Sequence, residues 1–358
     1  MEKLFVQTST HPYFIYTEED IRFSITELLP KNYSSYFIIT DDVVAKLYLD
    51  DCLQNFSQDQ QVAHSIIPHG EQTKSVDTYY QLLTDALSYG LDRQSLIIAL
   101  GGGVVGDIAG FVAATFMRGV DYIQMPTTIL AHDSSVGGKV AINHELGKNL
   151  IGSFYPPKAV IYDTATLTTL AAREVRSGYA ELMKEALIRD ESFFHDLLGT
   201  SLAALTNDQL VSHLQSGMAI KAEIVEADER ESGIRKHLNL GHTLGHALEA
   251  ELGYGKLTHG EAVAIGMLFA LRVSEKLFSI NLPYDELYNW LEQNHYPLTL
   301  KRLNPDLLLR KMKSDKKSVH NKVHMVLVKQ IGQIQDVEVP DQDLALLLDT
   351  FLRELVIE

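Results

Sequence analysis

Histidines and a carboxylate with the spacing of a metal site stand out in the second half of the chain. His242 and His246 are four residues apart, so on a helix both imidazoles leave the same face. His259 opens the next apolar helical run, and Glu181 lies on an earlier one with Lys184 a turn further on. Two histidines and a carboxylate can bind a divalent metal and leave a position for water or substrate. By itself this spacing is more typical of buried structural histidines, so the rest of the chain must decide.

A glycine-rich segment indicates a second site. The run Ser95–Leu100 is apolar after its first residue, as buried parallel strands are, and Gly101–Asp107 leads from it into a helix predicted over Ile108–Met117. This order matches the G-x-G-x-x-G pattern, in which glycines let backbone N–H groups approach a pyrophosphate. The acidic residue that usually follows would be Asp121, which precedes a strand instead of ending one. Asp42, at the end of an earlier strand, is the better candidate for binding ribose hydroxyls.

A third segment, from Asp133 to Gly152, is dense in glycine, lysine and asparagine. Its position between predicted strands favours a binding loop. Lys139 and Lys148, set among small residues, suit an anionic ligand. A mobile surface loop is the alternative.

The elements that must position these residues change character along the chain. Short apolar runs alternate with helical patterns up to about residue 170, and helical periods dominate afterwards, where only 323–328 alternates like a strand. This order predicts an α/β, Rossmann-like domain over residues 1–170, followed by a mostly α-helical domain over 171–358.

Composition restricts the classes of partner. Lys and Arg number 31 against 47 Asp and Glu, a formal charge of −16, which argues against nucleic acid but not against a small phosphorylated substrate. Cys52 is the sole cysteine, so an intrachain disulfide is impossible and a reducing compartment is expected. The first residues lack a signal-peptide pattern. The apolar stretch 96–117 contains Asp107 and several glycines, which favours a buried strand, loop and helix over a membrane span. We therefore expect a soluble, cytoplasmic protein.

Six motifs, in this order, resemble the 3-dehydroquinate synthase family. They are GGGVVGD (101–107), MRG (117–119), PTT (126–128), DSSVGGK (133–139), GKN (147–149) and NLGHTLGH (239–246). Each is weak alone, but together they are highly specific, and the resemblance covers about residues 36 to 330. It implies an NAD-binding α/β domain followed by a helical metal-binding domain, in agreement with the patterns above.

The resemblance also implies roles for individual residues. The metal, usually zinc or cobalt, would be bound by Glu181, His242 and His259, and His246 would lie near the substrate instead. NAD would contact Asp42, Glu71, Lys74, Gly103, Val104, Val105, Gly106, Asp107, Thr127, Thr128, Lys139, Lys148, Thr166, Leu167, Thr168 and Thr169. Substrate contacts would come from Arg118, Asp133, Asn149, Lys184, Lys221, Arg235, Asn239 and the Lys316-Lys317 pair. Glu185, where an aromatic residue is expected, and a shortened segment between Thr128 and Asp133 depart from the family pattern.

The family's reaction converts 3-deoxy-D-arabino-heptulosonate 7-phosphate into 3-dehydroquinate and phosphate, in the shikimate pathway to aromatic amino acids. It proceeds by transient oxidation with NAD, phosphate elimination, re-reduction and intramolecular aldol closure, and a homodimer is the family habit. Three alternatives are a metal-dependent polyol dehydrogenase, another sugar phosphate cyclase and a non-catalytic binding protein. The many cations and asparagines, more than a neutral polyol needs, argue against the first, and the intact Glu/His/His set argues against the last.

Overall fold

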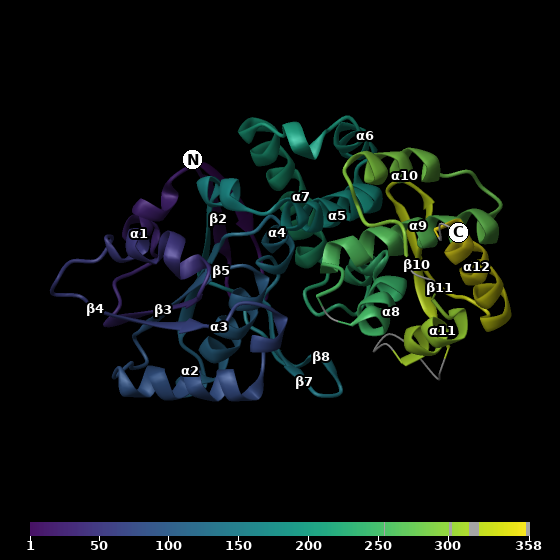
Figure 1. Ribbon diagram of the computed structural model, residues 1–358. Coiled ribbons are helices and arrows are strands. Elements are labelled where there is room, and N and C mark those ends of the chain that lie inside the picture. The colour runs from purple at the N-terminus through teal and green to yellow at the C-terminus, as the bar shows by residue number, and fades with distance from the viewer. Residues whose placement is uncertain (254, 301–302, 315–321, 356–358) are drawn as a thin grey trace. The chain divides into compact units, whose positions relative to one another are not determined.

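The computed structural model describes residues 1–253, 255–300, 303–314 and 322–355, which fall into two units (Figure 1). The first contains Met1–Leu170 with Lys221–Arg230, and the second contains Ala171–Ile220 with Glu231–Glu358. The segment 221–230 thus packs with the α/β part of the chain, whereas the sequence pattern groups it with the helices. The reason is that a helical period reports local structure and carries no information about which core the helix joins.

A seven-stranded sheet organises the first unit, in the order β1-β2-β9-β6-β5-β3-β4. Its strands are β1 (Glu2–Val6), β2 (Tyr13–Glu18), β3 (Ser35–Asp41), β4 (Gln61–Ile67), β5 (Leu96–Gly101), β6 (Asp121–Pro126) and β9 (Ala159–Asp163). Only the β1–β2 pair of this sheet is antiparallel, so the carboxyl ends of the other strands meet at one edge. Residues of β3 and β5 are buried almost throughout because both faces of the sheet are covered.

Each face of this sheet has its own core. Phe37 and Ile97 face the helices α2 (Val76–Ser88) and α3 (Gly103–Thr115). The opposite face packs against short helical turns, namely η1 (Ile21–Phe23), η2 (Ile25–Leu28), the π-helical η3 (Ala45–Leu49) and α1 (Asp50–Leu53). Cys52 lies in this second core with no exposed surface, and burial raises the pKa of its thiol to about 12.

Two predictions for this unit were wrong in detail. The helix predicted from Ile108 begins at Gly103, because Gly103–Gly106 form its first turn against neighbouring side chains. The segment predicted as a binding loop contains the hairpin of β7 (Lys139–His144) and β8 (Gly147–Phe154). Within β7, buried Val140 and Ile142 alternate with more exposed residues, a period of two that the glycines and lysines around it obscure.

The second unit is mostly helical, as predicted. Its helices are α5 (Ala172–Arg189), α6 (Glu191–Leu198), most of α7 (Asn207–Ala227), α8 (His242–Leu252), α9 (His259–Phe278), α10 (Tyr284–Gln293), α11 (Pro305–Ser314) and α12 (Asp341–Glu354). The helix predicted over 171–198 is interrupted at Asp190, whose side chain accepts a hydrogen bond from the Phe193 N–H and caps α6. A second strand, β11 (Gln333–Glu338), pairs with β10 (His324–Gln330). It was missed because its sequence, QIQDVE, has no apolar run.

Helix α9 is the central element of this unit. All of its residues from Gly260 to Leu271 are buried, as expected for a helix segment that is apolar on every side. Glycines let the neighbouring backbones come close, since a Cβ on Gly260 would lie 1.9 Å from the Ser177 carbonyl oxygen. A Cβ on Gly266 would lie equally close, 1.9 Å, to the Gly241 carbonyl oxygen. In the described part of the chain, no helix is both long and apolar enough to cross a membrane.

Candidate active site

Three helices of the second unit bring the predicted metal ligands together. Glu181 lies on α5, His242 is the first residue of α8 and His259 is the first residue of α9. One donor atom from each lies within 4.8 Å of the others. Local structure fixes both histidines, because Gly241 adopts a left-handed φ of 79° before α8 and Thr258 forms a capping box with Glu261 at the start of α9.

Hydrogen bonds orient the two imidazoles. The Nδ1 atom of His242 lies 3.1 Å from the Leu240 carbonyl oxygen, and that of His259 lies 3.2 Å from Glu249 Oε2. The Nε2 atoms then lie 3.8 Å and 3.4 Å, respectively, from Glu181 Oε1. Carbonyl and carboxylate acceptors behind metal-binding histidines select the tautomer with a free Nε2. Glu249 was not predicted from the sequence, although its position three residues after His246 on α8 is a signal that could have revealed it.

Electrostatics at this cluster favour a cation. Burial lowers the pKa of His259, but hydrogen bonds and charge from Glu181 and Glu249 outweigh it and raise that pKa to about 10. The same two carboxylates would favour a divalent ion in place of the proton. His246 lies beside the cluster, with its ring centroid 5.3 Å from that of His242 and 5.9 Å from that of His259. His246, Glu249 and His259 form a second, overlapping donor group.

The other site residues predicted in this unit are polar groups in or near buried surroundings. Lys184 Nζ donates to Glu181 Oε2, and both side chains are almost fully buried. Arg235 is buried on η8 (Ile234–Asn239). Asn239 Nδ2 donates to Glu231 Oε1 over 2.9 Å. The Lys316-Lys317 pair lies outside the described residues.

In the first unit, the glycine-rich turn after β5 forms a close-fitting cradle. A Cβ on Gly102 would lie 3.0 Å from Thr128 Cγ2, and one on Gly103 would lie 3.0 Å from Ser134 Oγ. The buried hydroxyls of Thr127 and Ser134 have no hydrogen-bond partner among the described residues. A helix N-terminus with small residues and available hydroxyls at the carboxyl ends of parallel strands suits a pyrophosphate ligand. Ser134 appears in the sequence motif, but its role was not predicted.

Lys74 is the centre of a charged cluster beside this turn. Its ammonium group is buried and lies 2.6 Å from Asp107 Oδ2, 2.6 Å from Asn149 Oδ1 and 3.7 Å from Glu71 Oε1. Burial lowers the pKa of Lys74, but Asp107 and Glu71 outweigh it, so that pKa is raised and the ammonium stays charged. The structure thus brings together four predicted residues from separate segments of the chain.

The remaining predicted cofactor residues differ in their surroundings. Asp42 follows β3 and accepts hydrogen bonds from the N–H (2.8 Å) and Nδ1 (2.9 Å) of His69, which lower the pKa of its carboxyl group. Hydroxyls in η6 (Thr164–Thr169) bond within the protein: Thr166 Oγ1 donates to the Asp163 carbonyl, and Thr169 Oγ1 lies 2.8 Å from the Tyr48 hydroxyl. Thr168 donates to the Ala165 carbonyl in the same way, and Leu167 is buried. Val104 and Val105 lie in the first turn of α3, Lys139 is exposed and Lys148 is half-buried.

Predicted substrate residues of this unit include one ion pair. Lys221 Nζ lies 2.9 Å from Asp133 Oδ2, and the same ammonium also donates to the Asp133 carbonyl oxygen. Arg118 is exposed and has a left-handed φ of 70°, between Met117 at 47° and Gly119 at 114°. The left-handed conformations of Met117 and Arg118 are strained, as is often found at functional sites, whereas glycine adopts a positive φ freely.

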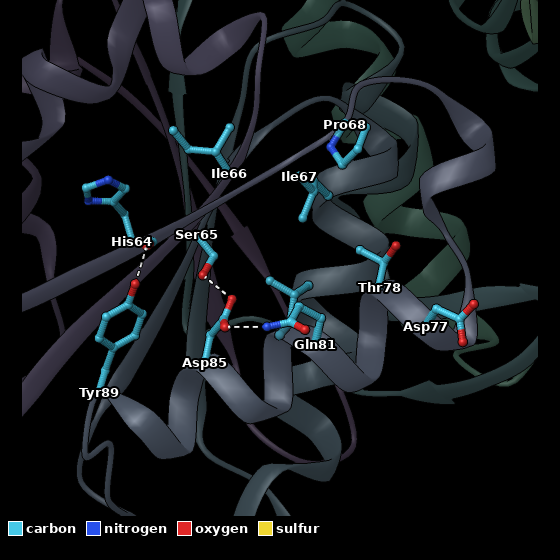
Figure 2. Close-up of a pocket in the computed structure, with 11 residues that line it drawn as sticks. His64, Ser65, Ile66, Ile67, Pro68, Asp77, Thr78, Gln81, Asp85 and Tyr89 are labelled. Atoms are coloured by element: carbon cyan, nitrogen blue, oxygen red, sulfur yellow. Dashed lines mark hydrogen bonds between the residues drawn. The ribbon is translucent and has the colours of Figure 1, made fainter.

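A pocket of about 570 Å³ on the first unit is lined by other residues (Figure 2). It is lined by β4 and α2, and its polar side chains bond one another: Ser65 Oγ donates to Asp85 Oδ2 (2.6 Å) and Gln81 Nε2 to Asp85 Oδ1 (2.8 Å). It contains none of the predicted site residues. The clusters around Glu181 and Lys74 are therefore the better candidates for the active site.

Comparisons with known proteins point to one family. The family model for the N-terminal part of 3-dehydroquinate synthase matches residues 64–177, and that for the C-terminal part matches residues 178–318. The 3-dehydroquinate synthase of Oceanobacillus iheyensis is 54% identical over 356 residues, 99% of each chain. That of Geobacillus thermodenitrificans is 55% identical over 322 residues, 89% of this chain and 88% of the relative.

Solved structures of similar fold include two cyclizing synthases and, at lower TM-scores, dehydrogenases such as the glycerol dehydrogenase of Schizosaccharomyces pombe (TM-score 0.65, 17% identity, covering 95% of this chain and 88% of its own). A 2-deoxy-scyllo-inosose synthase in complex with carbaglucose-6-phosphate, NAD⁺ and Co²⁺ has a TM-score of 0.88 at 26% identity, covering 99% of this chain and all of its own. The 2-epi-5-epi-valiolone synthase of Streptomyces hygroscopicus, with NAD⁺ and Zn²⁺ bound, has a TM-score of 0.86 at 24% identity and covers 99% of both chains. The likenesses at 24% and 17% identity establish the fold alone.

Proposed function

The chain belongs to the 3-dehydroquinate synthase family, and we propose that it converts 3-deoxy-D-arabino-heptulosonate 7-phosphate into 3-dehydroquinate and phosphate. This reaction is a step of the shikimate pathway, which leads to chorismate and the aromatic amino acids. The observation that carries the proposal is the donor set of Glu181, His242 and His259, whose ligand atoms lie within 4.8 Å of one another. A second cluster, around Lys74, supports it.

Both implied cofactors fit the residues present. Two imidazoles and a carboxylate are the ligands of several catalytic zinc sites that leave a position open, so we assign a zinc or cobalt ion to Glu181, His242 and His259. The close approach at Gly102 and Gly103, with the Thr127 and Ser134 hydroxyls, suits the pyrophosphate of NAD. When bound, NAD supplies a reversible oxidation that acidifies a neighbouring C–H bond, and the divalent ion polarises substrate hydroxyls.

The chain's own polar residues then bind and orient the substrate. Cationic Arg118, Lys184, Lys221 and Arg235 would hold its phosphate and carboxylate through charge-assisted hydrogen bonds, which are stronger than neutral ones. Lys184 also donates to Glu181, and in that position it orients the metal-binding carboxylate. Asn149, Asn239, Asp133 and His246 would complete the substrate contacts. These contacts would position the phosphate as the leaving group, and a simple dehydrogenase does not need them.

Location and assembly are further parts of the proposal. A single, buried cysteine suits the reducing cytoplasm, where we place the protein. We assign it a homodimer, in keeping with the family resemblance, and light scattering coupled to size-exclusion chromatography would measure its mass in solution.

One assay separates this function from its nearest rivals. Phosphate release and absorbance at the NADH band are followed together after addition of the heptulosonate phosphate. We expect one phosphate for each 3-dehydroquinate formed and no accumulation of NADH. Growth of NADH in step with product would identify a dehydrogenase instead, and turnover of a different sugar phosphate alone would identify another cyclase.

A substitution tests the substrate side of the proposal. Arg235→Ala should lower turnover strongly and leave the affinity for NAD nearly unchanged, because the cluster that fits NAD lies on other segments. Arg310→Ala, which removes an exposed arginine from α11, is the control. Equal losses of turnover in the two variants would contradict the role of Arg235.

A further inference from the structure

Asn143 joins segments that carry predicted cofactor and substrate residues. Its side-chain Nδ2 donates to Glu71 Oε1 over 2.8 Å and to the Glu71 carbonyl oxygen over 3.3 Å. Its Oδ1 accepts a hydrogen bond from the Asn149 N–H over 2.9 Å. The amide orientation is unambiguous, because both Glu71 atoms can only accept and the Asn149 N–H can only donate.

The backbone of Asn143 explains why its side chain is needed. Its N–H donates to the Lys74 carbonyl oxygen over 2.7 Å, so it is turned away from β8. At this point the β7–β8 register shifts, between the pairs Ile142–Ile151 and His144–Gly147. The Asn143 side-chain oxygen therefore accepts the hydrogen bond of the Asn149 N–H at a gap in the ladder. Irregularities of this kind are common beside active sites, where they re-aim a side chain.

Asn149 is held from two sides as a result. Lys74 Nζ donates to its side-chain oxygen over 2.6 Å, while Asn143 accepts from its backbone. Asn149 has a left-handed φ of 53°, a conformation that asparagine tolerates better than most residues. Its place thus depends on Lys74 and Asn143, which are themselves joined through a backbone hydrogen bond.

We infer that Asn143 is a positioning residue that couples the NAD-binding segment Glu71–Lys74 to the substrate-binding Asn149. The inference rests on the proposed function for the roles of Glu71, Lys74 and Asn149, none of which it alters. Movement of the segment when NAD binds is transmitted to the hairpin through the Asn143 side chain in addition to the Lys74–Asn149 hydrogen bond, so NAD prepares Asn149 for the sugar phosphate.

Hydrogen exchange with NAD as the only ligand tests this coupling directly. In the unsubstituted protein, NAD should slow exchange of backbone amides in the hairpin 139–154. In Asn143→Ala, NAD at saturation should slow exchange at Asn149 and its neighbours less, although Lys139, Lys148 and the Lys74–Asn149 hydrogen bond still connect the hairpin to the cofactor. The Michaelis constant for the sugar phosphate should rise roughly tenfold, as expected for loss of a hydrogen bond to a charged group, with a much smaller change in turnover number.

Exchanging the hydrogen-bond donor and acceptor between positions 143 and 71, a polarity swap, separates positioning from simple destabilisation. Asn143→Asp keeps the acceptor for Asn149 but sets a carboxylate against Glu71, and it should behave like Asn143→Ala. Adding Glu71→Gln restores a donor–acceptor pair with reversed polarity, so the double variant should regain the NAD effect on the hairpin and match Glu71→Gln alone. If Asn143→Ala does not fold, the comparison of Asn143→Asp with the double variant still tests the inference.

His144→Ala is the matched control. It removes a hairpin hydrogen bond, from the Leu146 N–H to His144 Nδ1 over 3.0 Å, that does not involve the Glu71–Lys74 segment. It should keep the NAD effect. Loss of that effect in His144→Ala, an undiminished effect in Asn143→Ala, or failure of the swap to restore it would each overturn the inference. Failure of the proposed function would appear differently, as absence of 3-dehydroquinate in the unsubstituted protein.

Discussion

The two candidate clusters, one in each unit, are built from different materials. In the second unit, the group around Glu181 consists of side chains that meet from α5, α8 and α9. In the first unit, the turn after β5 offers backbone N–H groups and small side chains, and its shape depends on the absence of a Cβ atom at its glycines. The first kind of site depends on the identity of a few donor atoms, and the second on the close approach of chain segments. Substitutions should therefore affect them in different ways.

Removal of a metal ligand should give the largest effect. His242→Ala should lose most of its bound metal. Its affinity for the metal should fall by more than the roughly 10- to 100-fold loss that is typical of outer-shell changes. Activity should disappear with it, as it should after chelation, and zinc or cobalt should restore the chelated enzyme only. Elemental analysis of the purified variant measures the metal. His195→Ala, an exposed histidine on α6, is the control, and a full equivalent of metal in His242→Ala would contradict the assignment.

Weakening the support of a ligand should have a smaller effect on the same cluster. Glu249→Gln removes the charge behind His259 Nδ1, and the affinity for metal should fall roughly 10- to 100-fold while binding persists. Competition with a chromophoric chelator measures it. Glu251→Gln, on the same helix but paired with Lys311, should not change metal affinity. Equal affinities in the two variants would mean that Glu249 does not support His259.

The cofactor turn should respond to added volume instead. Gly102→Ala places a Cβ 3.0 Å from Thr128 Cγ2, so we expect the affinity for NAD to fall roughly tenfold, about 1.4 kcal/mol, with metal content unchanged. Calorimetric titration with NAD measures the change. At Gly199 the nearest atom would be 3.4 Å from a Cβ, an ordinary contact, and Gly199→Ala should bind NAD normally. An unaltered affinity for NAD in Gly102→Ala would show that this turn has space for a Cβ atom when the cofactor is bound.

A buried histidine outside both clusters should give the smallest effect. His213 bonds the Tyr179 hydroxyl (2.9 Å) and Asp196 Oδ2 (3.1 Å), and burial lowers its pKa more than Asp196 raises it. As the pH falls, His213 therefore takes up a proton in the unfolded chain before it does so in the folded protein. The contribution of His213 to the free energy of unfolding is complete above its unfolded pKa of about 6.5 and declines below that pH.

Urea unfolding of the metal-free protein between about pH 5 and pH 7.5 tests this sign. His213→Gln should depend less steeply on pH than the unsubstituted protein, and comparison of the two cancels the other histidines. His195→Gln should not differ from the unsubstituted protein. A steeper acid loss in His213→Gln would reverse the inferred direction of the pKa shift.

The contrast between the two clusters also explains what the sequence could predict. The α/β unit, the helical unit and the family were predicted correctly, because apolar period and motif order are local properties. The spacing of His242 and His246 placed both on one helix face but could not identify the ligand, since that depends on where Glu181 lies in the folded chain. Glu249 was missed because its role depends on a contact with another helix. The β7–β8 hairpin was missed because its short apolar alternation is surrounded by residues typical of loops.

The buried, unreactive thiol of Cys52 in the first unit offers a practical advantage for labelling. Cys52 is the only cysteine of the chain and has no exposed surface, and its raised pKa keeps the reactive thiolate scarce. A second cysteine introduced by Leu146→Cys, at the turn between β7 and β8 where the side chain is 86% exposed, would therefore react alone with a maleimide dye. The native thiol need not be removed first. A fluorophore at that position could follow the hairpin in real time as NAD is mixed in, so the protein already has the background that a single-site optical probe requires.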